Sequence, residues 1–133
     1  DNSTTKTINK TIKEMIQPTE VRLNNWVYST QLAKEVQISS IDYDGVFSFV
    51  NEVRYYDNIK PIPLSEERLL KSGFKHGSDD GIKHLFALGN FIVNKSDWDD
   101  KFILEIGDIE VEYLHHIQNL YFALTNQELI YTP

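Results

Sequence analysis

The sequence predicts an α+β fold, and three features lead to that prediction. The first half of the chain is rich in short runs that favour strands, such as Trp26-Val27-Tyr28. The stretch from Phe102 to Tyr113 alternates apolar and polar side chains around a Gly-Asp pair, which is typical of an antiparallel hairpin. The stretch Tyr113–Leu124 has apolar residues at steps of three and four, which indicates one face of a helix. We therefore expect a strand-rich N-terminal half, a short capped helix, and a C-terminal antiparallel hairpin sheet covered by a closing helix.

The length and hydrophobic content of the chain predict one domain. With 133 residues, of which 41% are hydrophobic, the chain can bury one core and is short for two. We assign residues 15–133 to this single α+β domain and residues 1–14 to an N-terminal extension. Ile8, Ile12 and Met15 fall at helical spacing, so the extension could form a short amphipathic helix. Alternatively, Met15 is the natural start and the extension is non-native, and both alternatives stay open.

The N-terminal half is predicted to form a small curled sheet that could close in a barrel-like way. Its expected strands are Val21-Arg22-Leu23 leading into Trp26-Val27-Tyr28, then Val36–Ile41, Val46–Val50 and Val53–Tyr56. Asp44-Gly45 lies between two of these apolar runs, which is a strong signal for a hairpin with a type I′ turn.

A short helix is expected directly after Pro61-Ile62-Pro63, a segment that blocks both helix and central strand and so predicts an extended linker. Each end of the helix has suitable local residues: Ser65 for the N-cap, Glu66 and Glu67 for the first turn, Leu64 with Leu69 for a hydrophobic staple, and Gly73 with Phe74 for the C-terminal cap. This helix is therefore specified by its own sequence.

The C-terminal sheet is expected to contain one or two strands from Leu85 to Val93 around Gly89-Asn90, followed by a hairpin with Gly107-Asp108 as a type II′ turn. Loops are expected at His76–Asp80 and at Asp97–Asp100. In the hairpin, the predicted facing pairs are Ile106 with Ile109, Leu104 with Val111, and Phe102 with Tyr113. The same register places Glu105 directly opposite Glu110 on the solvent face.

The closing helix is expected to cover that hairpin with one apolar face, formed by Leu114, Ile117, Leu120, Tyr121 and Leu124. His115 and Asn119 share its polar face at positions i and i+4. We interpret His115 as a boundary residue that hydrogen-bonds across the sheet edge. A proton-transfer or metal position is the alternative, since histidine titrates near neutral pH and is the commonest metal ligand.

Composition and charge argue against several classes of protein. The chain has no cysteine, so it has no disulfide framework and no thiolate metal site. Its net charge is −7, and seven acidic residues stand against one lysine between Ser96 and Glu112. Because nucleic-acid binding depends mainly on basic surface, we do not expect direct nucleic-acid binding. No apolar run approaches the ~20 residues of a membrane span, and no secretory signal is visible, so we expect a cytoplasmic protein.

Three segments carry a resemblance to a known family: RLNNWV at 22–27, PIPLSEERLLKSGF at 61–74 and EYLHHIQNLYFALTNQEL at 112–129. Together they resemble an uncharacterised family of small proteins common in Bacteroidetes phages, prophages and mobile elements, over roughly Met15 to Leu129. Family members commonly have an aromatic residue where this chain has Arg68. The resemblance implies a mobile-element context in a bacterial host cell, and it implies no particular activity.

The sequence favours a binding protein over an enzyme. It contains no P-loop, no dinucleotide-binding glycine pattern and no GxSxG elbow, and no cofactor is expected. We predict a small phage or mobile-element accessory protein that acts by protein–protein binding, for example as an inhibitor of a host defence system. Aromatic residues often anchor interfaces, and acidic residues suit a basic partner. We expect the acidic face of the C-terminal hairpin, with Trp98 beside it, to be the contact surface, formed by Trp98, Glu105, Asp108, Glu110 and Glu112.

Two alternatives from other classes remain. The first is a metal-assisted hydrolase that uses His115, His116 and nearby carboxylates. Neighbouring residues of a helix point about 100° apart, which makes these two histidines a poor joint ligand set. The second alternative is a structural component of a virion.

Overall fold

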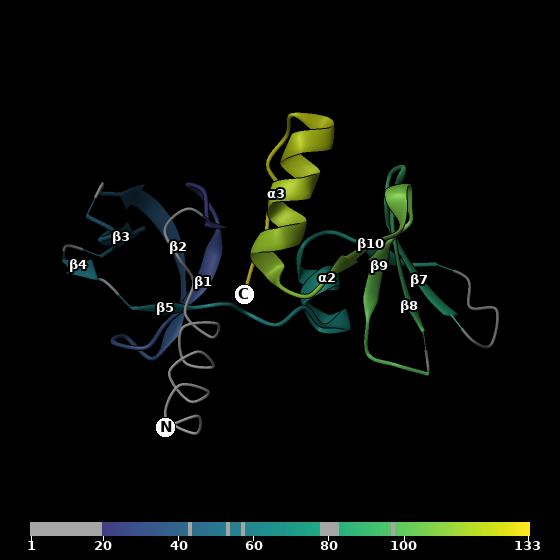
Figure 1. Ribbon diagram of the computed structural model, residues 1–133, viewed down its shortest axis with the longest axis horizontal. Helices are drawn as coiled ribbons and strands as arrows, with labels where there is room; N and C mark the ends of the chain where they lie inside the picture. The colour runs from purple at the N-terminus through teal and green to yellow at the C-terminus, as the bar shows by residue number, and fades with distance from the viewer. Residues whose placement is uncertain (1–19, 43, 53, 57, 78–82, 97) are drawn as a thin grey trace, which may run out of the picture. The chain divides into compact units, whose positions relative to one another are not determined.

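The computed structural model describes residues 20–42, 44–52, 54–56, 58–77, 83–96 and 98–133. Within them it contains two antiparallel sheets of five strands each and two α-helices, so the predicted α+β class is confirmed (Figure 1). The chain groups into two compact units, Asp1–Ile62 and Pro63–Pro133. The assignment of residues 15–133 to one domain stays a prediction, and the extension 1–14 lies outside the described residues.

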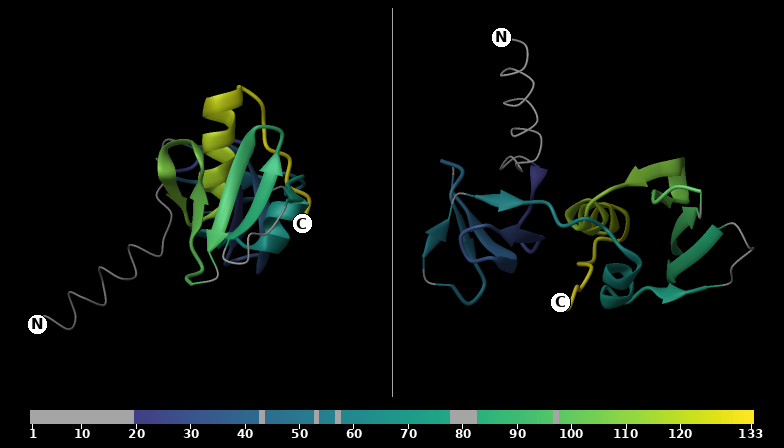
Figure 2. Two further views of the ribbon diagram at one scale, coloured as in Figure 1. Left: turned by 90° about the vertical axis from the view of Figure 1, so that its right-hand side faces the viewer. Right: turned by 90° about the horizontal axis from the view of Figure 1, so that it is seen from below.

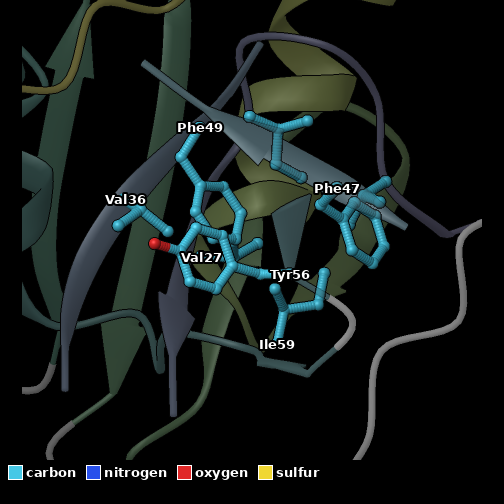
Figure 3. Close-up of a cluster of buried hydrophobic side chains, with 8 residues drawn as sticks. Val27, Val36, Phe47, Phe49, Tyr56 and Ile59 are labelled. Carbon is cyan, nitrogen blue, oxygen red and sulfur yellow. The ribbon is translucent and has the colours of Figure 1, made fainter. Parts of the chain in front are cut away.

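The first unit contains a sheet with the strand order β4-β3-β2-β1-β5. Its strands are β1 (Trp26–Ser29), β2 (Lys34–Ile41), β3 (Phe47–Phe49), β4 (Tyr55–Tyr56) and β5 (Ile59–Lys60). Alternate side chains turn to one face and form the core of this unit with Val21: Val27, Val36, Ile38, Phe47, Phe49, Tyr56 and Ile59 (Figure 3). The order of the described strands ends with β4 on one side and β5 on the other, so the barrel-like closure is not realised among them.

The predicted hairpin around Asp44-Gly45 is confirmed, because β2 and β3 pair in antiparallel fashion. Its turn type is different from the prediction. The N–H of Asp42 donates to the carbonyl of Val46 at 2.7 Å, and Gly45, with φ of +81°, donates to the carbonyl of Asp42 at 2.9 Å. A two-residue type I′ turn would pair Val46 with the residue directly before Asp44, whereas here Val46 bonds to Asp42. The connection is therefore longer than two residues, with glycine in the left-handed position.

Helix α2 (Glu66–Lys71) has both predicted caps. The Ser65 hydroxyl accepts a hydrogen bond from the N–H of Arg68 at 3.2 Å. At the other end Gly73 has φ of +92°, its N–H donates to Leu70, and the N–H of Phe74 donates to the carbonyl of Leu69 at 3.1 Å. These are the two bonds of a Schellman motif. The preceding prolines connect the two units, whose boundary falls between Ile62 and Pro63.

Replacing Ser65 with alanine is expected to lower the free energy of unfolding by about 1 kcal/mol, because the Arg68 N–H loses its acceptor. The matched control is Ser39→Ala, which removes an exposed hydroxyl from β2; its hydrogen bond to the Ser48 hydroxyl can be replaced by water, so the effect should be smaller. Urea denaturation followed by circular dichroism measures both changes. Equal effects of the two substitutions would contradict the capping role of Ser65.

The second unit contains a sheet with the order β10-β9-β8-β7-β6. Its strands are β6 (Lys75–His76), β7 (Lys83–Leu88), β8 (Phe91–Ser96), β9 (Phe102–Leu104) and β10 (Ile109–Val111). Leu88 pairs with Phe91 across Gly89-Asn90, and Gly89 has φ of +59°, so the turn predicted there is confirmed. His76 was expected in a loop but lies in β6, and residues 78–80 of that expected loop are outside the described residues.

The predicted register of the β9–β10 hairpin is wrong by two residues. Ile109 pairs with Leu104 and Val111 with Phe102, while a short 3-10 helix, η2 (Ile106–Asp108), makes the turn. Both Gly107 and Asp108 have positive φ in it. The N–H of Glu105 donates to the carbonyl of Ile92 in β8 at 2.9 Å, so the β8–β9 ladder continues to Glu105, whereas β10 begins only at Ile109. A shift of two leaves the faces unchanged, so Phe102, Leu104 and Val111 are buried as expected.

Helix α3 (Leu114–Thr125) confirms the predicted closing helix to within one residue at each end. It contacts β10, and the ring of Tyr121 packs edge-on against Phe91 of β8 at 5.1 Å. Its buried face differs from the prediction: Leu114 and Ile117 are buried as expected, but so are His115 and Gln118, while Leu124 is 52% exposed. Burial is therefore concentrated in the first half of α3.

The chain after α3 returns to α2 in the same unit. Asn126 ends the helix in the left-handed conformation, with φ of +57°. Leu129 and Tyr131 are buried beyond it, and the N–H of Thr132 donates to the carbonyl of Lys71 at 3.1 Å. The C-terminal segment is thus part of the core of the second unit, which the sequence did not predict.

Candidate protein-binding surface

The predicted contact residues are all exposed, but the structure divides them between two ends of the second sheet. Trp98, 84% exposed, lies in the loop between β8 and β9. Glu105 and Asp108 lie at the β9–β10 turn, where β8 begins. β8 is six residues long, which at about 3.3 Å per residue separates its ends by roughly 17 Å. The expectation that Trp98 lies beside these two acidic residues is therefore wrong.

The two other acidic residues take separate positions along β10. Glu110 pairs with Ile103 of β9, so the predicted facing pair of Glu105 and Glu110 is not formed. Glu112 follows β10, and its carbonyl accepts a hydrogen bond from the N–H of Leu64 at 3.0 Å. Its carboxylate is exposed, near the end of the sheet that carries the Trp98 loop. The four predicted acidic residues therefore do not form one compact surface.

A groove that the sequence did not predict lies where two turns meet the second half of α3. We call it the end groove; it has a volume of about 360 Å³ and is lined by Leu88, Gly89, Asn90, Phe91, Ile106, Tyr121, Leu124 and Thr125. The β7–β8 turn and η2 lie at the same end of the sheet because β8 and β9 are antiparallel neighbours. Most of the lining side chains are apolar, and Ile106 and Leu124 are 56% and 52% exposed.

The sequence contained a partial signal for this groove. Leu124 belongs to the apolar stripe of α3, and Ile106 belongs to the alternating pattern of the hairpin, so both were expected in the core. Ile106 instead lies in the turn, and Leu124 lies on the last helical turn, where it borders open space. Two apolar residues that the fold leaves exposed thus come together, with the carboxylates of Glu105 and Asp108 on the same turn as Ile106.

The two histidines of α3 form an aromatic cluster with Tyr113. The ring of His115 stacks on Tyr113 at 5.8 Å and meets His116 at 4.4 Å and 63°. His115 is only 1% exposed, so the expectation that it lies on the polar face is wrong. Among the described residues, neither of its ring nitrogens has a hydrogen-bond partner, so the expected bond across the sheet edge is also not formed.

Burial sets the charge of His115. Loss of solvent, and to a lesser degree the neighbouring His116, lowers the pKa of His115 to about 4. The ring is therefore neutral at pH 7. In the described part of the chain, no group of three or more histidine, cysteine, aspartate or glutamate side chains is arranged to hold a metal ion. This geometry gives no support to the alternative of a hydrolase built on His115 and His116.

Across the described ranges, no helix is long and apolar enough to cross a membrane. Comparison of the chain with models of protein families, with curated proteins and with solved structures finds no match.

Proposed function

We propose that this protein acts by binding another protein, and that the end groove receives an apolar side chain of the partner. One observation supports the proposal above all others. The groove is apolar, has room for a side chain, and keeps Ile106 and Leu124 half exposed although neither is needed in the core. Apolar side chains that remain exposed in a concave site favour association, because a partner removes them from water.

The charge around the groove indicates the chemistry of the partner segment. Glu105 precedes Ile106, and Asp108 follows it by two residues, so both carboxylates belong to the turn that forms one wall. An apolar residue flanked by lysine or arginine would therefore fit best. The net charge of −7 would also increase the rate at which a basic partner associates.

The biological setting that we propose comes from the resemblance stated above. A small accessory protein of a phage or mobile element would act in the cytoplasm of a bacterial host cell. One specific function of this kind is inhibition of a host defence nuclease, since the acidic side chains could occupy the basic channel in which such a nuclease binds nucleic acid.

Substitution in the groove provides the first test. Ile106→Asp should weaken the binding of the partner at least about tenfold, because it places a charge in the apolar site. Ile130→Asp is the matched control, because Ile130 is 70% exposed and lies outside the groove. The partner is first isolated from host lysate by wild-type protein, and its affinity for each variant is then measured by isothermal titration calorimetry.

Reversal of charge tests the second part of the proposal. Glu105→Lys combined with Asp108→Lys should reduce affinity, whereas Asp99→Lys combined with Glu112→Lys makes the same change in net charge elsewhere. Equal effects of the two pairs would show that only total charge matters. A partner that is lost with Trp98→Ala and retained with Ile106→Asp would place the contact at the opposite end of the sheet and refute the groove.

A further inference from the structure

The second sheet has an outer face that no described helix of its unit covers. Its inner face is the core, where Phe74 and Tyr121 of the second unit both pack against Phe91. Both α2 and α3 lie on this inner side, so that in the left view of Figure 2 the sheet stands in front of them. By the strand register, the outer side chains are those of Lys75, Leu85, Ala87, Ile92, Asn94, Ser96, Ile103 and Glu110.

Apolar side chains occupy the middle of this outer face. Leu85 and Ala87 on β7, Ile92 on β8 and Ile103 on β9 are all partly exposed. An antiparallel sheet with one face in water usually alternates apolar residues inward with polar residues outward. These strands depart from that alternation, which favours a further layer over the outer face.

The charges at the two edges of the face are opposite. Lys75 lies on β6, the last strand on one side, and Glu110 lies on β10, the last strand on the other side; both are exposed. If two copies face each other about a two-fold axis parallel to the strands, the order of strands is reversed, and β6 of each copy lies over β10 of the other. Each Lys75 then approaches a Glu110 of the other copy. A two-fold axis across the strands would instead bring β6 over β6, and like charges would meet.

We propose that the outer face binds a second copy of this chain, so that two sheets pack face to face in a symmetric dimer. Five strands about 4.8 Å apart, of two to six residues at about 3.3 Å each, give a footprint of roughly 320 Å² on each copy. This is below the roughly 800 Å² per partner of a standard interface, so the dimer is weak and depends on concentration. The end groove is not part of the outer face, so the dimer and the proposed protein partner are independent of each other.

Sedimentation velocity of the full chain from about 5 to 500 µM tests the dimer. Wild-type protein should shift from monomer to dimer over this range, and Ile103→Asp should remain monomeric. Lys75→Glu and Glu110→Lys should each weaken the dimer at least about tenfold, because each brings like charges together. The double variant exchanges the two charges and should restore the wild-type dimerisation constant to within about threefold. Asp44→Lys is the control for net charge, since Asp44 lies in a turn of the first unit.

Three results would overturn the proposal: a wild-type protein that stays monomeric throughout, a dimer that survives Ile103→Asp, or a double variant that is no better than the single ones. Circular dichroism shows whether each variant is folded. If Ile103→Asp does not fold, the single and double variants of Lys75 and Glu110 test the dimer without it, because both residues are exposed and lie outside the core.

Discussion

Truncating Leu114 to alanine is expected to lower the free energy of unfolding of the second unit by about 2–5 kcal/mol. Leu114 is fully buried at the start of α3, so the substitution loses apolar burial and leaves a cavity. Leu124→Ala removes the same atoms from the same helix, but its side chain is 52% exposed, and we expect a change of less than about 1 kcal/mol.

Hydrogen exchange under native conditions can measure both substitutions, because it reports the stability of each segment. The amides of α3 and of β7 to β10 should lose protection in Leu114→Ala and keep it in Leu124→Ala. Comparable losses in the two variants would mean that the whole apolar stripe of α3 is buried, as its sequence pattern predicts.

Replacing His115 with leucine is expected to make the protein more stable, and increasingly so as the pH falls. At pH 7 the gain should be about 1–3 kcal/mol, because the neutral ring buries two nitrogens that have no hydrogen-bond partner among the described residues. Leucine is similar in size and has no polar atom. The stacking of His115 on Tyr113 is lost and offsets part of this gain.

The pH dependence follows from the difference in pKa between the folded and unfolded chain. In the folded protein the pKa of His115 is about 4, below its ordinary value of 6.5, so between these values the unfolded chain binds the proton and the folded one does not. Stability therefore falls as the pH is lowered from about 6.5 towards 4. From pH 7 to pH 5 the loss due to His115 is about 2 kcal/mol.

Urea denaturation of the wild-type protein and of His115→Leu at pH 7 and at pH 5 measures this loss. It is the amount by which the free energy of unfolding falls further in the wild-type protein than in His115→Leu between the two pH values. His76→Leu is the matched control, because it removes an exposed histidine from β6. It should leave the loss between pH 7 and pH 5 in place. A wild-type pH dependence that persists in His115→Leu would show that other groups cause it.

The cap residues of α2 were the most accurately predicted part of the fold. The bonds from Arg68 to Ser65 and from Phe74 to Leu69 join residues at most five positions apart, so the local sequence contains everything that determines them. The Gly89-Asn90 turn was predicted for the same reason.

The predictions that failed in the hairpins concerned turn geometry and strand register. The register of β9 and β10 was wrong because η2 makes the turn instead of Gly107-Asp108 alone, and the alternation within the hairpin fits either register. The type of the Asp44-Gly45 turn was wrong because the N–H of Asp42 donates to the carbonyl of Val46, which makes the connection longer than two residues. In the β9–β10 hairpin the alternation of apolar residues was correct and the pairing was not, since alternation is unchanged when a register shifts by two.

The candidate sites show the same division between sequence and structure. The pattern of the strands predicted correctly that four acidic residues are exposed, namely Glu105, Asp108, Glu110 and Glu112. The pattern did not predict how these residues are distributed around the sheet. The end groove and the outer face both depend on which strands become neighbours, and His115 is buried because of what the fold packs around it.

The sequence by itself determined the α+β class, the ends of both helices and the inward or outward direction of most strand residues. These properties depend on side-chain preferences and on repeats of two or 3.6 residues, which are local. Only the tertiary structure decided the strand register, the burial of His115, the exposure of Leu124 and the formation of the groove. The register depends on the geometry of the turn, and the other three depend on contacts between segments far apart in the chain, because the free energy of burial belongs to the packed structure as a whole.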